Sequence, residues 1–214
     1  EKDKVRLIWG YPAHMTFIEG MFCMPLIRAY QREKSAYGIW IQYAKGHMKY
    51  LMSKRRKANN WLGLDWSQYD SHLPAWLIRD AFSILKEQID FSRYDTWGAP
   101  TDSDTLPRLW EEIVRYFINT PIKMPDNKVF VKHHGVPSGS FFTNLIDSIC
   151  NSIMLHYLLA GHTYQRDAMW VFGDDGLIAV GPGLDLEAFS IEALHAFGAH
   201  LSIDKTELGI YVPF

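Results

Sequence analysis

The stretch that decides the fold is Met169-Trp170-Val171-Phe172-Gly173-Asp174-Asp175-Gly176-Leu177-Ile178-Ala179-Val180. Apolar, β-prone residues flank a short polar turn of two glycines and two aspartates. This pattern predicts a β-hairpin with two carboxylates at its tip. A rigid tip can hold a metal ion, because adjacent carboxylates repel each other unless a cation or solvent lies between them. Asp and Gly are also common in ordinary exposed turns, so this stretch alone leaves both interpretations open.

A second pair of carboxylates lies upstream. Trp61-Leu62-Gly63-Leu64 predicts a buried strand that runs into Asp65, and Asp70 follows five positions later. A carboxylate at the end of a buried strand is costly unless a partner satisfies it. The alternative is a helix-capping or surface aspartate. We expect a helix to follow, because apolar residues recur at helical spacing at Leu77, Ile78, Ala81, Phe82, Leu85 and Ile89.

The segment Gly135-Val136-Pro137-Ser138-Gly139-Ser140 predicts a flexible loop with exposed backbone amides and hydroxyls. It leads into a long helix expected over about 141–160 and ended by Gly161. Thr143, Asp147 and Asn151 recur every four residues and form a polar stripe on this helix. A polar stripe is typical of a solvent-facing side. Here it follows a Gly-Ser loop at a helix N-terminus, where a phosphate or ribose can bind.

Further elements follow from periodicity and turn residues. Helices are expected over 16–30, 106–118 and 186–197, strands over 4–9 and 201–203, and a hairpin over 122–132. Residues 92–105 are rich in Ser, Asp, Pro and Gly and indicate a loop.

The composition indicates a folded chain with a substantial core. The 214 residues are 48% hydrophobic, 14% aromatic and only 21% charged. The net charge of -2 counts mildly against a nucleic-acid binder, although charge can be unevenly distributed. Cys23 and Cys150 lie among apolar residues, which predicts buried free thiols and a reducing compartment rather than a disulfide or zinc site. No apolar run is long enough for a membrane span. Because the chain starts at Glu1 and stops at Phe214 without a clear terminal element, we expect a fragment of a longer protein.

The three polar segments have a specific order. A strand ending in Asp-x4-Asp, a Gly-Ser loop entering a striped helix, and a hairpin tipped with Gly-Asp-Asp resemble motifs A, B and C of viral RNA-dependent RNA polymerases. The sequences of residues 65–70, 73–82 and 135–143 are most similar to those of polymerases from the partitivirus and picobirnavirus group of double-stranded RNA viruses. Residues 4–8 resemble the end of motif F, and 197–205 resemble motif D. The resemblance extends from about Lys4 to Glu207.

The resemblance implies an α+β fold. We expect a right-hand polymerase palm, which is an antiparallel sheet with packed helices, together with part of the fingers. Residues 1–60 would be partial fingers, 61–90 palm, 91–134 a fingers insertion and 135–214 palm, with the thumb absent.

The resemblance also implies a reaction. A polymerase of this group synthesises RNA on an RNA template by nucleotidyl transfer, and so replicates and transcribes a double-stranded RNA virus genome. Two Mg²⁺ ions, which Mn²⁺ can replace, would be held by Asp65, Asp174 and Asp175. Such ions activate the attacking hydroxyl and stabilise the leaving group in an in-line displacement. Lys205 would protonate the leaving pyrophosphate.

Other positions are implied to contact the nucleotide or template. Arg6 would hold the triphosphate, and Asp70 would accept a hydrogen bond from the ribose 2′-hydroxyl, which distinguishes RNA from DNA. Ser138, Gly139 and Thr143 would contact the template or the incoming nucleotide. Asp147 occupies the position of a ribose-sensing Asn in many positive-strand RNA virus polymerases, and Asn151 lies one turn further. Two facing carboxylates, Asp70 and Asp147, need a bridging donor.

The implied partners are the RNA template, the nascent RNA and ribonucleoside triphosphates, with a viral capsid protein as a further candidate and no membrane. The expected location is the virion interior or the host cytoplasm. Without a thumb and complete fingers, the isolated chain is expected to be inactive. Two alternatives compete: a reverse transcriptase, against which Phe172 and Asp70 argue, and a non-catalytic palm-like module that binds metal or RNA. Retention of every expected carboxylate argues against the second.

Overall fold

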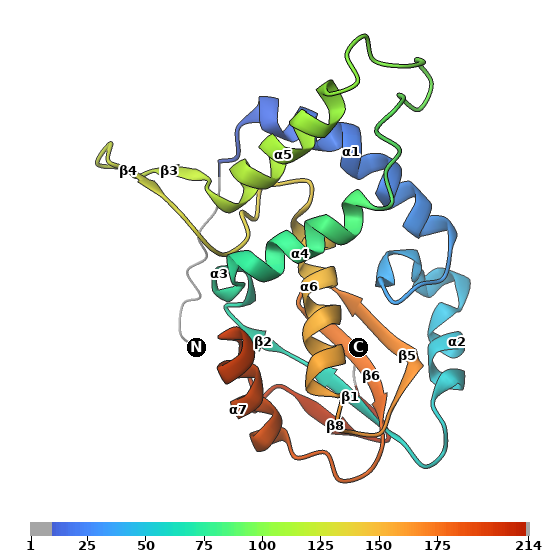
Figure 1. The fold of residues 1–214 in the computed structure, drawn as a ribbon. Helices are drawn as coiled ribbons and strands as arrows, with labels where there is room; N and C mark the ends of the chain where they lie inside the picture. The colour runs from blue at the N-terminus through green and yellow to red at the C-terminus, as the bar shows by residue number, and fades with distance from the viewer. Residues whose placement is uncertain (1–9, 213–214) are drawn as a thin grey trace.

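The computed structural model describes residues 10–212. Its lower part is a four-stranded sheet covered by helices, and its upper part is a group of helices and loops (Figure 1). The sheet has the order β5-β6-β1-β8 and every neighbouring pair is antiparallel. Its strands are β1 (Asn60–Leu64), β5 (Tyr164–Phe172), β6 (Asp175–Val180) and β8 (Glu207–Gly209). The predicted α+β class, with an antiparallel sheet and packed helices, is confirmed.

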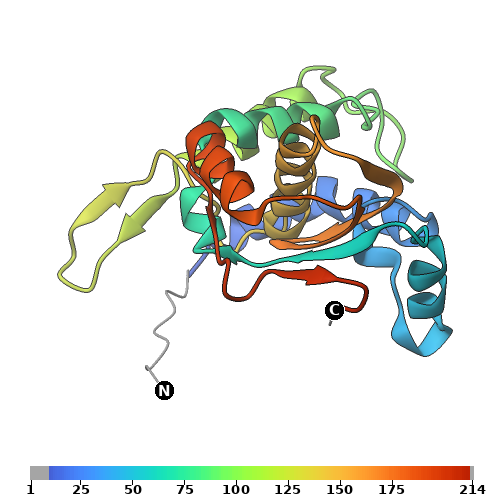
Figure 2. The ribbon, with the colours of Figure 1, turned by 90° about the horizontal axis from the view of Figure 1, so that it is seen from below.

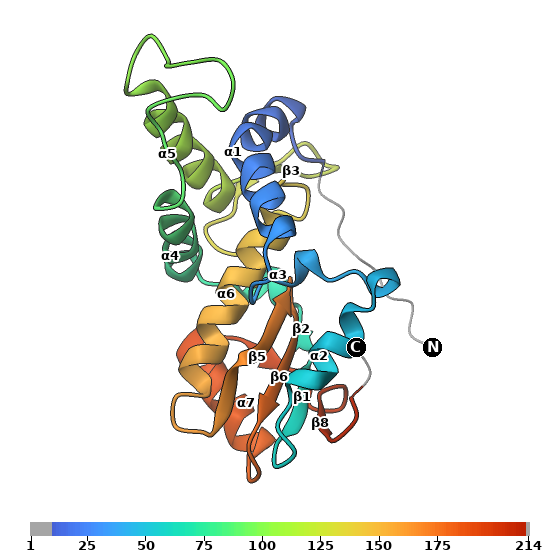
Figure 3. The same ribbon diagram turned by 90° about the vertical axis from the view of Figure 1, so that its right-hand side faces the viewer.

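Consecutive residues are buried along β6 and the second half of β5, so both faces of the sheet are covered. One face packs against α6 (Thr143–Leu158) and α7 (Leu186–Phe197). The opposite face, which includes Trp61 and Trp170, is covered by Trp40 and by Leu51 of α2 (His47–Lys54). Figure 3 shows α6 and α2 on opposite sides of the sheet. The sheet is therefore a fixed layer, and the segments at its edge are positioned by packing on both sides.

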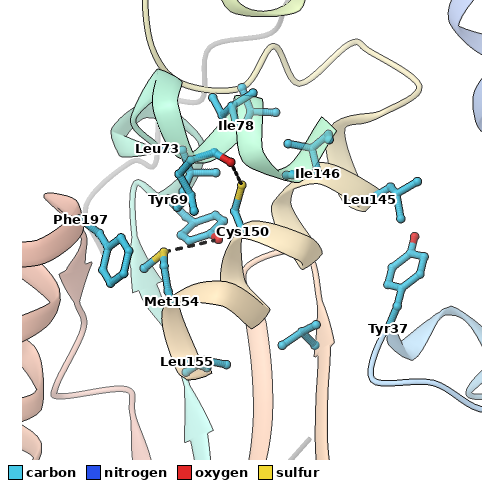
Figure 4. Close-up of a cluster of buried hydrophobic side chains, with 14 of the residues drawn as sticks. Tyr37, Tyr69, Leu73, Ile78, Leu145, Ile146, Cys150, Met154, Leu155 and Phe197 are labelled. Carbon is cyan, nitrogen blue, oxygen red and sulfur yellow. Dashed lines mark hydrogen bonds between the residues drawn. The ribbon is translucent and has the colours of Figure 1, made fainter. Parts of the chain in front are cut away.

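The helix α6 runs through the centre of the molecule. Its side chains Cys150 and Met154 face Tyr69 of the short helix α3 (Tyr69–His72) (Figure 4). The Tyr69 hydroxyl donates a hydrogen bond to the Asp147 carbonyl at 3.0 Å. The predicted helix over 141–160 is thus confirmed with slightly shorter bounds, and Cys150 is buried as predicted.

The upper part is joined to α6 by a cluster of aromatic rings. It contains the helices α1 (Ala13–Arg32), α4 (Ala75–Lys86) and α5 (Thr105–Ile118). Edge-to-face ring pairs connect Phe82, Trp110 and Phe142, with ring centroids 5.3 to 5.6 Å apart. Such pairs add about 0.5–1.5 kcal/mol each beyond the burial of their surface. The start of α6 is therefore fixed by rings from α4 and α5.

A two-stranded hairpin projects from the body of the molecule (Figure 2). Its strands are β3 (Pro121–Lys123) and β4 (Val129–Val131), as the sequence predicts. At its base, the Lys132 ammonium donates to the carbonyl oxygens of Phe117, Ile118 and Gly135. These contacts tie the C-terminal end of α5 to the loop that precedes α6.

The remaining elements are short. They are the 3₁₀ turns η1 (Gly38–Trp40) and η2 (Tyr43–Lys45), and the strands β2 (Trp66–Ser67) and β7 (His200–Leu201), which pair with each other. The strand predicted over 201–203 is shorter and starts one residue earlier. The helices predicted over 16–30, 106–118 and 186–197 are confirmed as α1, α5 and α7, and 92–105 is mostly loop. The strand predicted over 4–9 lies outside the described residues.

Candidate active site

The hairpin tip predicted from the sequence is present between β5 and β6. Phe172 and Asp175 are opposite each other in the register, and Gly173 adopts a left-handed φ of 66° that favours glycine. The Gly173 N–H donates to the Ser148 hydroxyl on α6 at 2.7 Å. Asp174 and Asp175 are exposed beyond this contact. The turn is therefore attached to α6 while its carboxylates remain accessible.

Asn151 attaches the same turn a second time. Its side-chain N–H₂ donates to the carbonyl oxygens of Gly173, Asp174 and Asp175 at 3.0 to 3.2 Å, and its oxygen accepts from the Trp66 indole at 3.1 Å. The side chain is 0% exposed. The sequence indicated that Asn151 contacts a nucleotide. The structure differs, because a fully buried amide with both ends engaged positions the turn instead.

Asp65 arrives at this tip from the neighbouring strand. Leu64, the last residue of β1, is opposite Gly176 of β6, so the same antiparallel register places Asp65 beside Asp175. The Asp65 carbonyl accepts from the Ser202 N–H at 2.8 Å, which fixes its backbone. Its carboxylate forms an ion pair with Lys205 at 3.6 Å. The fold thus brings together the first and last segments of the predicted constellation.

A cavity of about 430 Å³ opens at this edge of the sheet, and Asp65, Asp175, Lys205 and Glu207 contribute to its lining. Burial raises the pKa of Asp175, and the negative charges of Asp174 and Asp65 raise it further. This repulsion is what a bound cation would relieve. Within residues 10–212, no three acidic, His or Cys side chains form a complete metal cage. Mg²⁺ does not need one, because it retains waters and takes one or two protein carboxylates plus substrate phosphates. The donor set therefore fits Mg²⁺.

Asp70 and Asp147 form a carboxyl pair near the tip. Asp147 is 3% exposed, and its Oδ1 has no donor from the described part of the chain. Burial raises the pKa of Asp147 well above its usual value, and the charges of Asp70 and Asp174 raise it further. Burial and the negative charge of Asp174 also raise the pKa of the neighbouring Asp70. Protonation of one of these two carboxyl groups would supply the bridging donor that two facing carboxylates require.

The Gly-Ser loop is more firmly held than predicted. Gly135 and Val136 donate to the carbonyl oxygens of Leu73 and Asp70 at 2.8 and 2.7 Å, and the loop residues 135–137 are buried. Ser138 is exposed and Gly139 half-buried. The prediction of a flexible loop with exposed amides is thus wrong for its ends, because the backbone N–H groups there already have partners.

The Thr143 hydroxyl, predicted to contact template or nucleotide, donates inside the protein. It lies 2.8 Å from the Pro137 carbonyl and 3.0 Å from that of Ser140. These bonds close the loop at the start of α6. Thr143 thus holds the loop in shape, whereas Ser138 and Gly139 remain open to solvent. Arg6, predicted to hold the triphosphate, lies outside the described residues.

Sequence reasoning missed Ser148, Asn144 and Glu207. Asn144 accepts a hydrogen bond from the Tyr37 hydroxyl at 2.7 Å, and its amide lies beside Gly173. Asn144, Ser148 and Asn151 recur at spacings of four and three, so they share one face of α6. That spacing was a signal for a helix face that contacts the hairpin tip. Glu207 carried no comparable signal.

Comparison with known proteins identifies the fold. The family model described as viral RNA-dependent RNA polymerase matches residues 1–213. The chain belongs to this family. The RNA-directed RNA polymerase of Cryptosporidium parvum virus 1 (strain KSU-1) is 30% identical over 213 residues, covering 96% of this chain and 38% of that protein. The RNA-directed RNA polymerase of White clover cryptic virus 1 is 27% identical over 206 residues, covering 83% of this chain and 32% of that protein.

Solved polymerase structures agree. The RNA-dependent RNA polymerase of a human picobirnavirus superposes with a TM-score of 0.76 at 18% identity, over 97% of this chain and 37% of that one. Its insertion-loop deletion mutant gives 0.77, also at 18% identity, over 97% and 38%. The predicted resemblance to the partitivirus and picobirnavirus polymerases is confirmed. The chain spans between about a third and two fifths of the length of these relatives.

Proposed function

We propose that the full-length protein synthesises RNA on an RNA template by nucleotidyl transfer. The observation that carries this proposal is the convergence of Asp65 and Asp174-Asp175 at one edge of the sheet, within a chain of the viral polymerase family. Both named relatives are RNA-directed RNA polymerases. In this reading, residues 61–90 and 135–214 form the palm, and residues 1–60 and 91–134 belong to the fingers.

The chemistry needs two divalent cations, and the protein mainly positions the reacting groups and neutralises charge. Asp65 and Asp174 would be the main ligands, and Asp175 would be a supporting carboxylate. Mg²⁺ held by these carboxylates would supply Lewis-acid chemistry, lowering the pKa of the attacking hydroxyl and neutralising charge on the phosphate oxygens. The residues of this chain orient the ligands, through Ser148 and Asn151 for the turn and Ser202 for Asp65.

Lys205 is placed to handle a proton. Its ammonium lies at the same cavity as Asp65 and Asp175, 3.6 Å from the Asp65 carboxylate, and is mostly exposed. We infer that it donates a proton to the leaving pyrophosphate, as the motif resemblance implies. Its ion pair with Asp65 would exchange for contacts to phosphate when nucleotide and metal bind.

Ribose recognition is assigned to Asp70, with Asp147 behind it. The protonated Asp147 carboxyl donates to Asp70 and leaves the other Asp70 lone pairs for a ribose 2′-hydroxyl. Ser138 and Gly139 would contact template or nucleotide, and Arg6 the triphosphate. We propose that the protein replicates and transcribes a double-stranded RNA virus genome in the virion interior or host cytoplasm, with a capsid protein as a further partner. No helix within residues 10–212 has the length and hydropathy to cross a bilayer.

The test uses full-length protein, an RNA template-primer and ribonucleotides with Mg²⁺ or Mn²⁺. Asp174→Asn should reduce extension by at least about 10³-fold, because it removes a charged metal ligand from a reaction that depends on metal. Asp167→Asn, on an exposed part of β5, is the matched control and should retain wild-type activity. Undiminished synthesis by Asp174→Asn would refute the site. Equal use of deoxynucleotides would instead favour a reverse transcriptase.

A further inference from the structure

Glu19 is a buried carboxyl group that the proposed reaction does not use. It lies on α1 and is 0% exposed, and in residues 10–212 no Lys, Arg or His forms an ion pair with it. A buried acidic group is costly unless hydrogen bonds satisfy it. Its neighbours on α1 include buried Met15, Phe22 and Cys23. A carboxyl group in such surroundings needs a specific set of donors.

Three donors meet this carboxyl group. The Tyr11 hydroxyl donates to Oε1 at 2.6 Å, the Ser140 hydroxyl to Oε2 at 2.8 Å, and the Phe141 N–H to Oε2 at 2.9 Å. Two of the three come from the end of the Gly-Ser loop, more than 120 residues further along the chain. Bonds of this kind to an ionised acceptor are about twice as strong as neutral ones. Glu19 is therefore an anchor for the loop rather than a partner within its own helix.

Two further contacts from α1 reach Phe141. The Cys23 thiol donates to the Phe141 carbonyl at 3.3 Å. The Phe141 ring also packs against α1 at Gly20, where a Cβ would lie at an ordinary contact distance of 3.5 Å from the ring. Glu19 and Cys23 are one helical turn apart and face the same side. As a result, α1 satisfies both the N–H and the C=O of Phe141.

These contacts limit the free part of the loop. At its other end, Gly135 and Val136 are bonded to the carbonyl oxygens of Leu73 and Asp70. Between the two anchors lie Ser138 and Gly139, the loop residues that remain accessible. The position of this dipeptide is thus set from α1 on one side and from the Asp70 segment on the other.

We propose that Glu19 is a positioning residue that fixes Ser138 and Gly139 for contact with the template or incoming nucleotide. This inference rests on the proposed function, which supplies the substrate for the loop. Without the carboxylate, the Ser140 hydroxyl and the Phe141 N–H lose their shared acceptor and the loop gains conformational freedom. Substrate binding then weakens more than the chemical step, because the carboxylates of the hairpin tip are held independently by Ser148 and Asn151.

The test compares Glu19→Ala with Gln165→Ala in the full-length protein. Gln165 is also buried, accepts from the Arg56 N–H and the Asn59 amide, and lies at the start of β5, at the opposite end of the strand from the hairpin tip. Both variants should lower the melting temperature. Glu19→Ala should raise the apparent KM for the templated nucleotide by about tenfold, as expected for loss of a charge-assisted bond, with kcat within about threefold of wild type. Gln165→Ala should leave KM within about twofold.

Glu19→Gln is the conservative variant. Its amide oxygen can still accept from Ser140 and Phe141 while the charge is lost, so the rise in KM should be about threefold. Hydrogen exchange over residues 138–142 should be faster in Glu19→Ala and Glu19→Gln than in Gln165→Ala. Equal KM values for Glu19→Ala and Gln165→Ala would overturn the inference. If Glu19→Ala does not fold, wild-type KM and wild-type exchange in Glu19→Gln would overturn it.

The two proposals fail in different ways. A wild-type protein that does not extend a primer on RNA contradicts the proposed function, while the exchange comparison still decides whether Glu19 holds the loop. An active wild type with unaltered exchange in the Glu19 variants contradicts only the role of Glu19.

Discussion

At the scale of single residues, Asn151 has the most specific task. One amide contacts three successive carbonyl oxygens of the turn that carries Asp174 and Asp175. Asn151→Ala removes these bonds and leaves the Trp66 indole without its acceptor. We expect kcat to fall by about 10- to 100-fold, which corresponds to about 1.4–2.7 kcal/mol in the transition state, with little change in KM.

Single-turnover primer extension measures this loss. Ser152→Ala, on the next position of α6 and only half-buried, is the control and should behave as wild type. Wild-type kcat in Asn151→Ala would show that the turn keeps its shape without the amide.

Asp147 gives a prediction about pH. Burial, Asp70 and Asp174 raise its pKa well above 3.8, so the folded state binds a proton that the unfolded state releases once the pH exceeds about 4. Stability from this group is complete below that pH and is lost as the pH rises through the folded pKa. Asp147→Asn retains a donor toward Asp70 and has no proton to lose. The variant should therefore gain stability relative to wild type as the pH rises from 4 to 8.

Denaturant unfolding at several pH values measures the difference, whose slope is at most about 1.4 kcal/mol per pH unit. Asp167→Asn controls for the loss of one negative charge. The titration also involves Asp70 and Tyr69, which face Asp147 and have raised pKa values of their own. A pH-independent difference would contradict a protonated Asp147.

Predictions for single residues succeeded where the residue types needed for the chemistry are also those that the turn requires. Asp174 and Asp175 could be placed at a hairpin tip because Gly-Asp-Asp-Gly between apolar runs has few other conformations. The spacing of Asn144, Ser148 and Asn151 indicates a shared helix face, but the partners of Asn151 could not be identified from sequence, because backbone carbonyls carry no sequence signature. The role of Glu19 could not be read from sequence either, because its donors Ser140 and Phe141 lie more than 120 positions away.

At the scale of elements, the loop before α6 is held by close approach of backbone to backbone. Gly135 has a φ of 74°, and a Cβ there would lie 2.8 Å from the Asp70 carbonyl oxygen. Gly135→Ala should destabilise the protein by about 2–4 kcal/mol, through left-handed strain plus this collision. Gly98→Ala is the matched control, because Gly98 has a φ of 78° and nothing within 4 Å of its Cβ position. Its cost should be about 1 kcal/mol.

Thermal unfolding of the two variants separates the cost of left-handed strain from the cost of the collision with Asp70. A similar loss of stability in both would mean that strain alone acts at Gly135. A larger loss in Gly135→Ala, accompanied by a higher KM, would show that the loop moves when the Asp70 contact is disturbed.

Helix and strand positions were predictable where periodicity was strong. The helix α7 was predicted with its observed bounds, since Asp185 caps it by accepting from two backbone N–H groups and Gly198 ends it at a φ of 68°. The polar stripe of α6 misled, because two of its three residues, Asp147 and Asn151, point into the protein. Period alone cannot distinguish a solvated polar face from one whose partners come from other elements.

At the scale of the whole molecule, this chain corresponds to about two fifths of its relatives. Loop Ser138-Gly139 and the carboxylates of the hairpin tip are all accessible, but a duplex needs contacts beyond these to remain bound. We expect the 214-residue chain alone to give no measurable primer extension under conditions in which the full-length protein is active. Processive synthesis by the isolated chain would contradict this expectation.

The bonds from Asn151 have a consequence for how such a sequence can evolve. The amide binds the main chain of the hairpin tip and not its side chains. The shape of the tip therefore does not depend on which side chains it carries. A viral lineage can therefore exchange a residue at the tip in one mutational step without first rebuilding the turn. Substitutions at positions 174 and 175 should impair replication far more than folding. Substitutions at Asn151 should be tolerated least, because each would affect both folding and replication.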